Sequence, residues 1–369
     1  MSRNNVTVTT PPAAFDAAAG DPLGLRARSR RTTAWSAGLG VALVVTVLVA
    51  VGAGAVTTSP GTVAQVVAAH LLGRDSDVSP ATDAIVWQVR LPRVLLGAAV
   101  GAGLAVCGVA LQAMVRNVLA DPYLLGVNSG ASTGAAAAIL FGVGGGLGIY
   151  ALPASAFLGA LAASLLVFVV ARTSGRVTST RLLLAGVAVG YALYAATSFL
   201  IFASGSAEGS RSVMFWLLGS LGLARWDATL GIVVVVVGVT VVVTTVLGRR
   251  LDALAVGDET AHVLGVSPER FRLAMLVLVS LCVGVVVAAS GSIGFVGLVV
   301  PHLARRAVGA THVRVVPVAA LMGAVLLVWA DVVARVLLAP QEIPIGIITA
   351  LVGAPFLLVL IRRMHAVAA

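Results

Sequence analysis

Long apolar runs separated by short polar segments fill the chain from residue 34 almost to its end. A helix rises 1.5 Å per residue, so the first run, 34–56, reaches about 34 Å. That length crosses the ~30 Å hydrocarbon layer of a bilayer and exceeds the apolar core of a signal peptide. The pattern predicts ten transmembrane helices, at 34–56, 93–114, 122–142, 149–171, 182–204, 228–248, 271–290, 293–309, 316–338 and 343–361. Because the run at 293–309 is short and glycines blur the boundary at 142–148, nine or eleven helices also fit.

Smaller features of the pattern refine this arrangement. A polar segment at 57–87 separates the first two runs, and an apolar patch at 213–223 is too short to cross a bilayer, which predicts a re-entrant or surface helix around Trp216. Glycines recur at four-residue spacing in three runs, which predicts closely packed helices. These pairs are Gly97 and Gly101, Gly130 and Gly134, and Gly186 and Gly190.

A polar segment at 251–270 interrupts the apolar pattern and has the signals of two short helices. Gly257 can end the first helix at positive φ, Asp258 can cap the second, Gly265 can end it, and Ser267-Pro268 can begin the next long helix. This segment contains both apolar and acidic positions. The apolar positions are Leu251, Leu254, Ala261 and Leu264, and the acids, which we expect to be exposed, are Asp252, Asp258 and Glu259. Two interpretations fit this pattern, a helix pair that docks into a groove of another protein and an interfacial pair that lies on lipid.

Composition supports a membrane protein and excludes several chemistries. Of 369 residues, 59% are hydrophobic and 10% are charged, and the mean hydropathy is +1.07. All 24 basic residues are arginine, so the chain can contain neither a P-loop lysine nor a Schiff-base lysine, and any nucleotide that drives it must bind to another subunit. Cys107 and Cys282 stand alone within apolar runs. We therefore expect no catalytic residue, metal site or cofactor in this chain.

The arginines are distributed unevenly between the two sides that ten spans define. With the N-terminus inside, eighteen of the 24 arginines fall on the inner side and six on the outer. This positive-inside asymmetry predicts a multi-pass protein of the cytoplasmic membrane, with both termini and the 251–270 segment in the cytoplasm. It also explains the net charge of +10 without a nucleic-acid partner. Residues 1–32 are rich in Thr, Pro and Ala and end in four arginines, which predicts a disordered cytoplasmic tail before the membrane domain at 33–369.

Three of the outer arginines stand at the ends of predicted spans. Arg90 and Arg93 stand at the start of the second, and Arg335 lies in the ninth. They can bind carboxylates of an extracytoplasmic partner or extend to lipid headgroups. Asp331 lies one helical turn before Arg335, so the two are expected to form a structural ion pair. An intramembrane acid also fits a proton-driven carrier, although pairing with arginine keeps a carboxylate ionised and makes it a poor proton shuttle.

Seven motifs in the same order resemble the FecCD family of bacterial ABC-importer permeases, from about residue 86 to the C-terminus. They are WQVRLPR at 87–93, GVALQAMVRNVLADPYLLGV at 108–127, WLLGSL at 216–221, LDALAVGDETAHVLGV at 251–266, GSIGFVGLVVPHLAR at 291–305, ADVVAR at 330–335 and EIPIGIITALVGAPF at 342–356. The family usually has proline where Val118 stands. The resemblance implies an all-α polytopic membrane protein of vitamin B12 permease-like (type II ABC importer) architecture, with ten transmembrane helices per subunit.

The resemblance also implies partners and site residues. Segment 251–266 would contain the coupling helices that dock into a dimer of cytoplasmic ABC ATPases, with Leu251, Asp252, Leu254, Gly257, Asp258, Glu259, Ala261, Leu264 and Gly265 at the contact. Arg90, Arg93 and Arg335 match arginines that meet glutamates of the substrate-binding lipoprotein. A second permease subunit, identical or a paralogue, would complete a pathway embedded in membrane lipid. The cargo would be a ferric siderophore, with cobalamin and haem as alternatives that the sequence leaves open.

Overall fold

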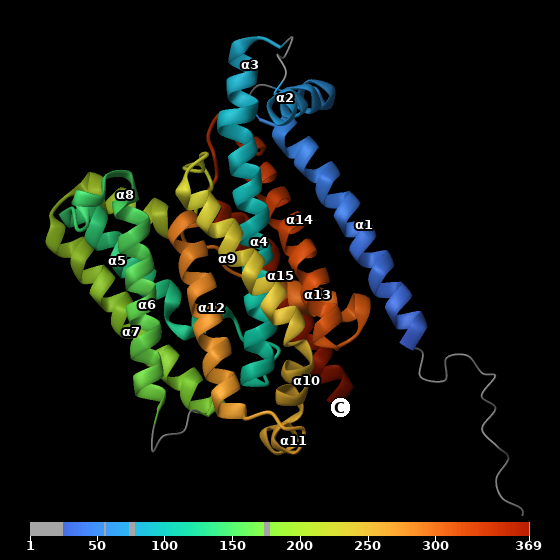
Figure 1. Ribbon diagram of the computed structural model, residues 1–369. Coiled ribbons are helices and arrows are strands. Elements are labelled where there is room, and N and C mark those ends of the chain that lie inside the picture. Colours follow the sequence, from blue (N-terminus) through green and yellow to red (C-terminus); the bar gives the residue numbers. More distant parts are fainter. Residues whose placement is uncertain (1–24, 55–56, 74–77, 173–177, 369) are drawn as a thin grey trace, which may run out of the picture.

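The computed structural model describes residues 25–54, 57–73, 78–172 and 178–368, and these form an all-helical bundle (Figure 1). Residues 1–24 of the tail predicted at 1–32 lie outside the described residues. In chain order the helices are α1 (Leu25–Gly52), α2 (Pro60–Leu72), α3 (Pro80–Ala84), the π-helical turn η1 (Ile85–Arg90), α4 (Leu91–Val115), the 3-10 turn η2 (Pro122–Leu125), α5 (Val127–Phe141), the 3-10 turn η3 (Gly145–Tyr150), α6 (Ala151–Ala171), α7 (Ser179–Ser204), α8 (Ala207–Leu217), α9 (Ala228–Val246), α10 (Gly248–Val256), α11 (Asp258–Val263), α12 (Pro268–Ser290), α13 (Val296–Val308), α14 (His312–Val336) and α15 (Ile345–Ala368).

All ten predicted apolar runs are helical, but two of the helices are shorter than expected. Within the described residues eight helices are long and apolar enough to cross a membrane. The other two, α5 and α13, have 15 and 13 residues and rise about 22 and 20 Å. Each follows a break in the helical path, at η2 before α5 and at 291–295 before α13. The ten-span pattern is therefore present with two partial spans.

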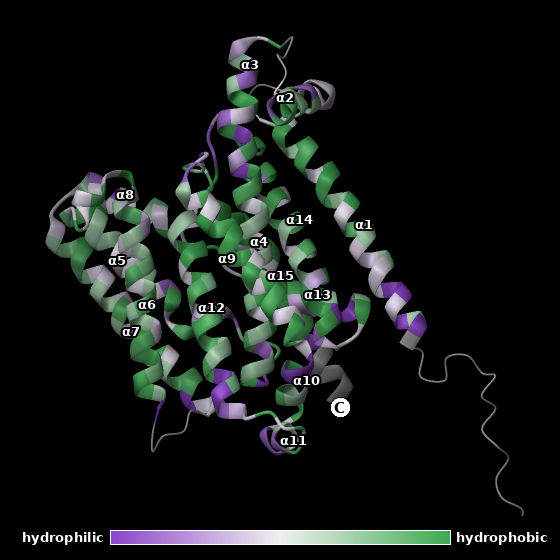
Figure 2. Cartoon of the chain, in the orientation of Figure 1, coloured by the Kyte–Doolittle hydropathy of each residue, from purple (hydrophilic) through white to green (hydrophobic). Residues whose placement is uncertain are grey.

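The polar positions mark the two ends of the bundle. Apolar residues dominate its middle, while polar residues gather around α2 and α3 at one end and around α10 and α11 at the other (Figure 2). We call these the α3 end and the α11 end. Helix α4 runs through the centre between them. It belongs to the most buried of the candidate spans, in which 78% of the residues in the apolar stretch are buried. It packs against α9, α12, α13 and α14, whereas α1 lies at one side of the bundle (Figure 1).

Glycines allow α4 and α14 to touch through their backbones. A Cβ on Gly101 would overlap the carbonyl of Gly323, and a Cβ on Gly323 would overlap that of Gly101. Similar contacts join α5 to α6 at Gly130 and Gly159. In a membrane, where helices gain little from the hydrophobic effect, such close approach is a main source of packing energy. The close packing predicted from glycine spacing is confirmed at these interfaces.

Two boundaries differ from the sequence prediction. Helix α1 begins at Leu25, so Arg26, Arg28, Arg30 and Arg31 belong to its first turns and not to a disordered tail. Arginine is a good helix former and a long apolar helix follows it, so the helix extends through the basic residues. The polar segment at 57–87 contains α2, α3 and the start of η1, which are too short to give a clear periodic signal. The apolar patch around Trp216 forms the end of the short helix α8.

Candidate functional site

The segment predicted to couple to an ATPase is a helix pair at the α11 end. Gly257 separates α10 from α11 at φ 156° and ψ 158°, a region that only glycine adopts without strain. Gly265 follows α11 at φ 77°, and the N–H of Val266 donates to the carbonyl of Ala261 at 2.8 Å, which closes the helix end. The two predicted glycine stops are thus confirmed by their backbone angles.

The apolar face of this pair is turned inward, which corrects one part of the prediction. Leu251, Leu254 and Ala261 are fully buried and pack on the permease's own helices. The apolar side chains left exposed on the segment are Val256, Val263 and Leu264, with Val263 exposed by 87%. Three of the four apolar positions among the nine predicted contact residues therefore hold the segment in place instead of facing a partner. Short surface helices need such an anchor because they are not stable alone.

Two carboxylates tie the pair to distant helices. Asp252 Oδ1 accepts hydrogen bonds from the backbone N–H of His312 at 2.9 Å and from its Nδ1 at 2.6 Å. Asp258 binds Arg272 Nη2 at 3.0 Å, and the Nε of Arg272 donates to the Met114 carbonyl at 3.4 Å. Asp258 does not cap α11 with its side chain as predicted, because its carboxylate is engaged by Arg272. Glu259 is exposed.

The three arginines predicted to dock a partner gather at the α3 end, and two of them, Arg90 and Arg335, are buried. Arg90 Nη1 donates to the carbonyls of Val51 and Gly52 at 3.0 and 3.2 Å. Arg335 donates to the carbonyls of Ala53 and Ala50 at 2.9 and 3.1 Å. Both side chains therefore bind the C-terminal carbonyls of α1, where the helix dipole favours positive charge.

Asp331 lies between two arginines and is the most enclosed charge of this group. Asp331 is 1% exposed, and Arg93 Nε donates a hydrogen bond to its Oδ1 at 3.0 Å. Arg335 Nε lies 3.0 Å from its Oδ2, without the angles of a hydrogen bond. The predicted Asp331–Arg335 ion pair is present, and Arg93 makes it a triad.

Glu342 completes this group and is its most accessible member. Its two oxygens accept from Arg93 Nη1 and Nη2 at 3.0 and 2.9 Å, a bidentate pair, and its side chain is 50% exposed. We call Arg90, Arg93, Asp331, Arg335 and Glu342 the α3-end cluster. Because Arg90 and Arg335 are each only 7% exposed, docking through these arginines stays a prediction, and Arg93 with Glu342 is the part that faces outward.

Several polar residues that organise the ends of the bundle were not singled out from sequence. They share one signal, a polar side chain inside or beside an apolar run. Gln112 on α4 donates to the carbonyls of Ala120 and Gly297 and accepts from Arg305. Tyr123 and Ile293 exchange two hydrogen bonds, of 2.8 and 2.9 Å. The others are Arg272, His312 and Glu342.

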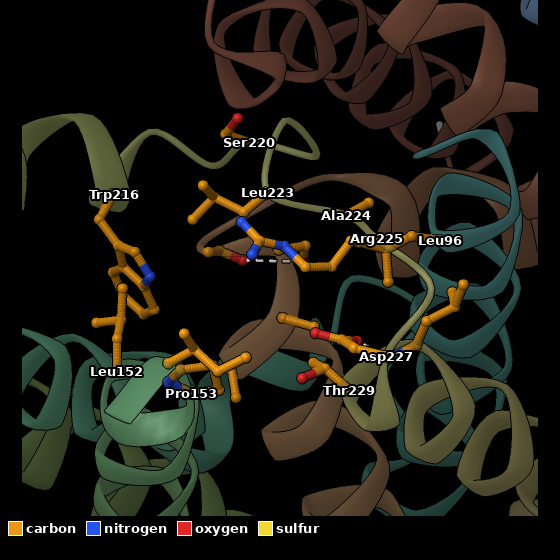
Figure 3. A pocket seen from close by; sticks show the side chains of 16 residues that line it. Leu96, Leu152, Pro153, Trp216, Ser220, Leu223, Ala224, Arg225, Asp227 and Thr229 are labelled. Carbon is orange, nitrogen blue, oxygen red and sulfur yellow. Dashed lines mark hydrogen bonds between the residues drawn. The ribbon is translucent and has the colours of Figure 1, made fainter. Parts of the chain in front are cut away.

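Two adjoining cavities open near the α3 end, beside the breaks in the helices. The smaller, of about 280 Å³, has Trp216, Leu152 and Pro153 on one side and the loop with Leu223 and Arg225 on the other (Figure 3). The larger, of about 580 Å³, shares Trp216 and Leu223 and reaches Arg93 and Glu342. Irregular backbone at 218–220 lies alongside and hydrogen-bonds to the end of α12 and the start of α15: the Ser220 N–H donates to Ser290 O at 2.8 Å, and the Gly346 N–H donates to Leu218 O at 3.0 Å. Within a membrane such backbone occurs where it is buried or lines a cavity.

Comparison with known proteins gives consistent matches along most of the chain. The FecCD transport family matches residues 42–363. The cobalamin import system permease protein BtuC of Halobacterium salinarum is 40% identical over 92% of this chain and 98% of its own. The hemin transport system permease protein HmuU of Yersinia pestis is 43% identical over 76% of this chain and 84% of its own. A metal-chelate type ABC transporter solved in an inward-facing conformation superimposes with a TM-score of 0.77 at 35% identity, covering 89% of this chain and 98% of that one.

Proposed function

Because this chain belongs to the FecCD transport family and is a multi-pass permease of an ABC importer, we propose that it moves an iron–siderophore complex across the cytoplasmic membrane. The α10–α11 pair carries this proposal. It is an ordered helix pair at one end of a transmembrane bundle, anchored by buried leucines, by the Asp258–Arg272 ion pair and by the contact of Asp252 with His312. A loop that only connects two spans needs none of this order.

The energy would come from a separate ATPase that binds at the α11 end. Val256, Val263 and Leu264 offer exposed apolar contacts there, and Glu259 an exposed charge. The N-terminal end of α1, with its four arginines, and the C-terminal helix α15 reach the same end, which supports a cytoplasmic location for both termini. The permease itself performs no covalent chemistry and needs no cofactor, since the partner binds the nucleotide.

A substrate-binding lipoprotein would dock at the α3 end. Arg93 is the arginine best placed to meet its carboxylates, because the Glu342 side chain that covers Arg93 is half exposed. Arg90 and Arg335 would contribute indirectly, by holding the end of α1 in place.

A second permease subunit would face this one across the transport pathway. Exposed aromatic side chains along α7 supply an apolar face for it or for lipid, and Tyr191 and Phe202 are exposed by 73% and 86%. The cargo would pass beside the broken helices, where cavities lined by Trp216, Phe215 and small hydroxyl residues suit weak contacts with a bulky organic chelate. Weak contacts favour release, whereas a tight polar site would retain the cargo.

Uptake measurements with the gene present and deleted test the function and the cargo together. Under iron starvation, cells lacking the gene should lose uptake of radiolabelled iron as its siderophore and keep uptake of labelled cobalamin. Loss of cobalamin uptake alone would transfer the assignment to cobalamin, the cargo named for the Halobacterium relative. Loss of hemin uptake alone would transfer it to haem. Uptake that persists in a strain carrying the gene with Asp331→Asn would exclude a proton-driven carrier, because such a carrier requires that carboxylate to titrate.

A further inference from the structure

Helix α14 lacks a cap of its own and receives one from the coupling segment. Its N-cap residue, Thr311, makes no side-chain hydrogen bond to the helix. Instead Asp252 of α10 reaches across 60 positions of sequence to accept from the first N–H of α14 and from the His312 ring. A carboxylate at a helix N-terminus satisfies an otherwise unpaired donor and interacts favourably with the helix dipole. The contact therefore forms only when α10 lies beside the first turn of α14.

The same junction is tightly fitted, and the start of α14 lies in direct contact with the start of α10. His312 is 6% exposed. A Cβ on Gly248, the first residue of α10, would lie only 2.7 Å from the backbone N of Val313. The backbone of one helix thus lies directly against that of the other, with no flexible side chain between them.

From this junction α14 runs the length of the bundle to the α3-end cluster. His312 and Arg335 are 23 residues apart in one helix, about 35 Å at 1.5 Å per residue. Along the way α14 is locked to α4 by the Gly101–Gly323 contact. At its far end Asp331 and Arg335 bind Arg93 of α4 and the C-terminus of α1. One continuous element therefore joins the coupling segment to the surface at the opposite end.

We propose that Asp252 and His312 form the joint through which movement of α10 is delivered to α14, so that α14 carries the ATP-driven motion to the α3-end cluster. The chain itself connects α10 to α9 and α11 to α12, so movement of the pair can reach the bundle through these covalent links. The contact between Asp252 and His312 adds a third, non-covalent link, which the order of the helices along the chain does not reveal. It rests on the proposed function of the chain as an importer permease. His312 acts as a positioning residue, since it touches neither cargo nor nucleotide.

The test uses the complete transporter, assembled from the permease, its ATPase and its binding lipoprotein in liposomes. His312→Ala should leave ATPase assembly and basal hydrolysis within twofold, while lipoprotein-stimulated hydrolysis and uptake per ATP fall about tenfold. His312→Asn, which keeps a donor near the Nδ1 position, should restore most of both. Asp252→Asn combined with His312→Ala should cost less than the two single changes added together, because both affect the hydrogen bond between the Asp252 carboxylate and the His312 ring.

Glu269→Gln provides the matched control, because it removes an exposed carboxylate one turn from the coupling segment at the start of α12. Stimulated hydrolysis that stays normal in His312→Ala would refute the joint. A parallel loss of assembly, basal hydrolysis and uptake would also refute it, since that pattern describes a structural anchor. Failure of the proposed function has a different signature: the unaltered chain would assemble with no ATPase and take up none of the labelled iron–siderophore, cobalamin or hemin.

Discussion

Asp331 at the α3 end and Asp252 at the α11 end are both carboxylates that join distant helices, but their surroundings differ. Asp331 is 1% exposed and lies between two guanidinium groups inside the bundle. The Asp252 side chain is 33% exposed and lies on a short surface helix, with one histidine as partner. An enclosed charge has no solvent to replace a lost partner, whereas a partly exposed one does. The first carboxylate therefore fixes helices in place, and the second joins parts that can move.

Removal of the Asp331 charge should have the largest effect on stability. Asp331→Asn leaves Arg93 and Arg335 without their shared buried anion, and breaking a buried ion pair from one side costs about 3–5 kcal/mol. Thermal unfolding of the detergent-solubilised permease would measure the loss. Glu342→Gln is the matched control on the same arginine, and because its carboxylate is half exposed it should cost no more than about 1 kcal/mol. Equal losses from both changes would remove the distinction between the enclosed and exposed charges.

A change at Gly257 should have an intermediate effect and act on movement more than on folding. Gly257→Ala places a side chain at φ 156°, at a cost of about 1–3 kcal/mol, although the nearest atom to the new Cβ, Arg116 Nη1, is 3.8 Å away. The strain therefore falls on the backbone between α10 and α11. Uptake per ATP should fall several-fold while assembly with the ATPase persists.

Gly231→Ala on α9 is the control for Gly257→Ala, because nothing lies within 4 Å of its added Cβ. Normal uptake by the Gly257 variant would show that the angle between α10 and α11 does not control coupling.

The smallest expected effect concerns the exposed edge of the α3-end cluster. If Arg93 receives a carboxylate of the lipoprotein, Glu342→Gln removes the internal competitor and should raise docking affinity about two- to fivefold at low salt. The gain should shrink as ionic strength rises, because exposed ion pairs are screened. Glu208→Gln neutralises an exposed acid on α8 and serves as control in the same binding assay. An unchanged affinity for the Glu342 variant would assign Arg93 to internal packing alone.

The apolar pattern predicts the helices well because a membrane-crossing helix needs a length of apolar sequence that few other structures require. The positive φ of Gly257 and Gly265 and the Asp331–Arg335 pair were likewise predictable, since they depend on neighbouring residues. The partial spans α5 and α13 were not, because their breaks depend on hydrogen bonds between segments far apart in sequence.

The orientation of the arginines could not be predicted for a related reason. Arg90 and Arg335 bind backbone carbonyls at the end of α1. Every residue has a backbone carbonyl, so the sequence does not indicate which carbonyls an arginine will bind. The same holds for His312, whose partner Asp252 lies 60 positions away. Sequence identifies the charged residues at each end, and only the packing of the helices decides which of them face outward.

The two arginines at the end of α1 also have a consequence for biogenesis. Arg335 binds the carbonyl of Ala50, so the two partners are 285 positions apart in a chain that is synthesised from its N-terminus. Helix α1 precedes the other described helices, so the chain must be translated through Arg335 before the last carbonyls of α1 gain their second guanidinium. Until then water or lipid headgroups must satisfy them. The end of this early helix is thus completed by a late one, so its hydrogen bonding depends on the assembly of the bundle.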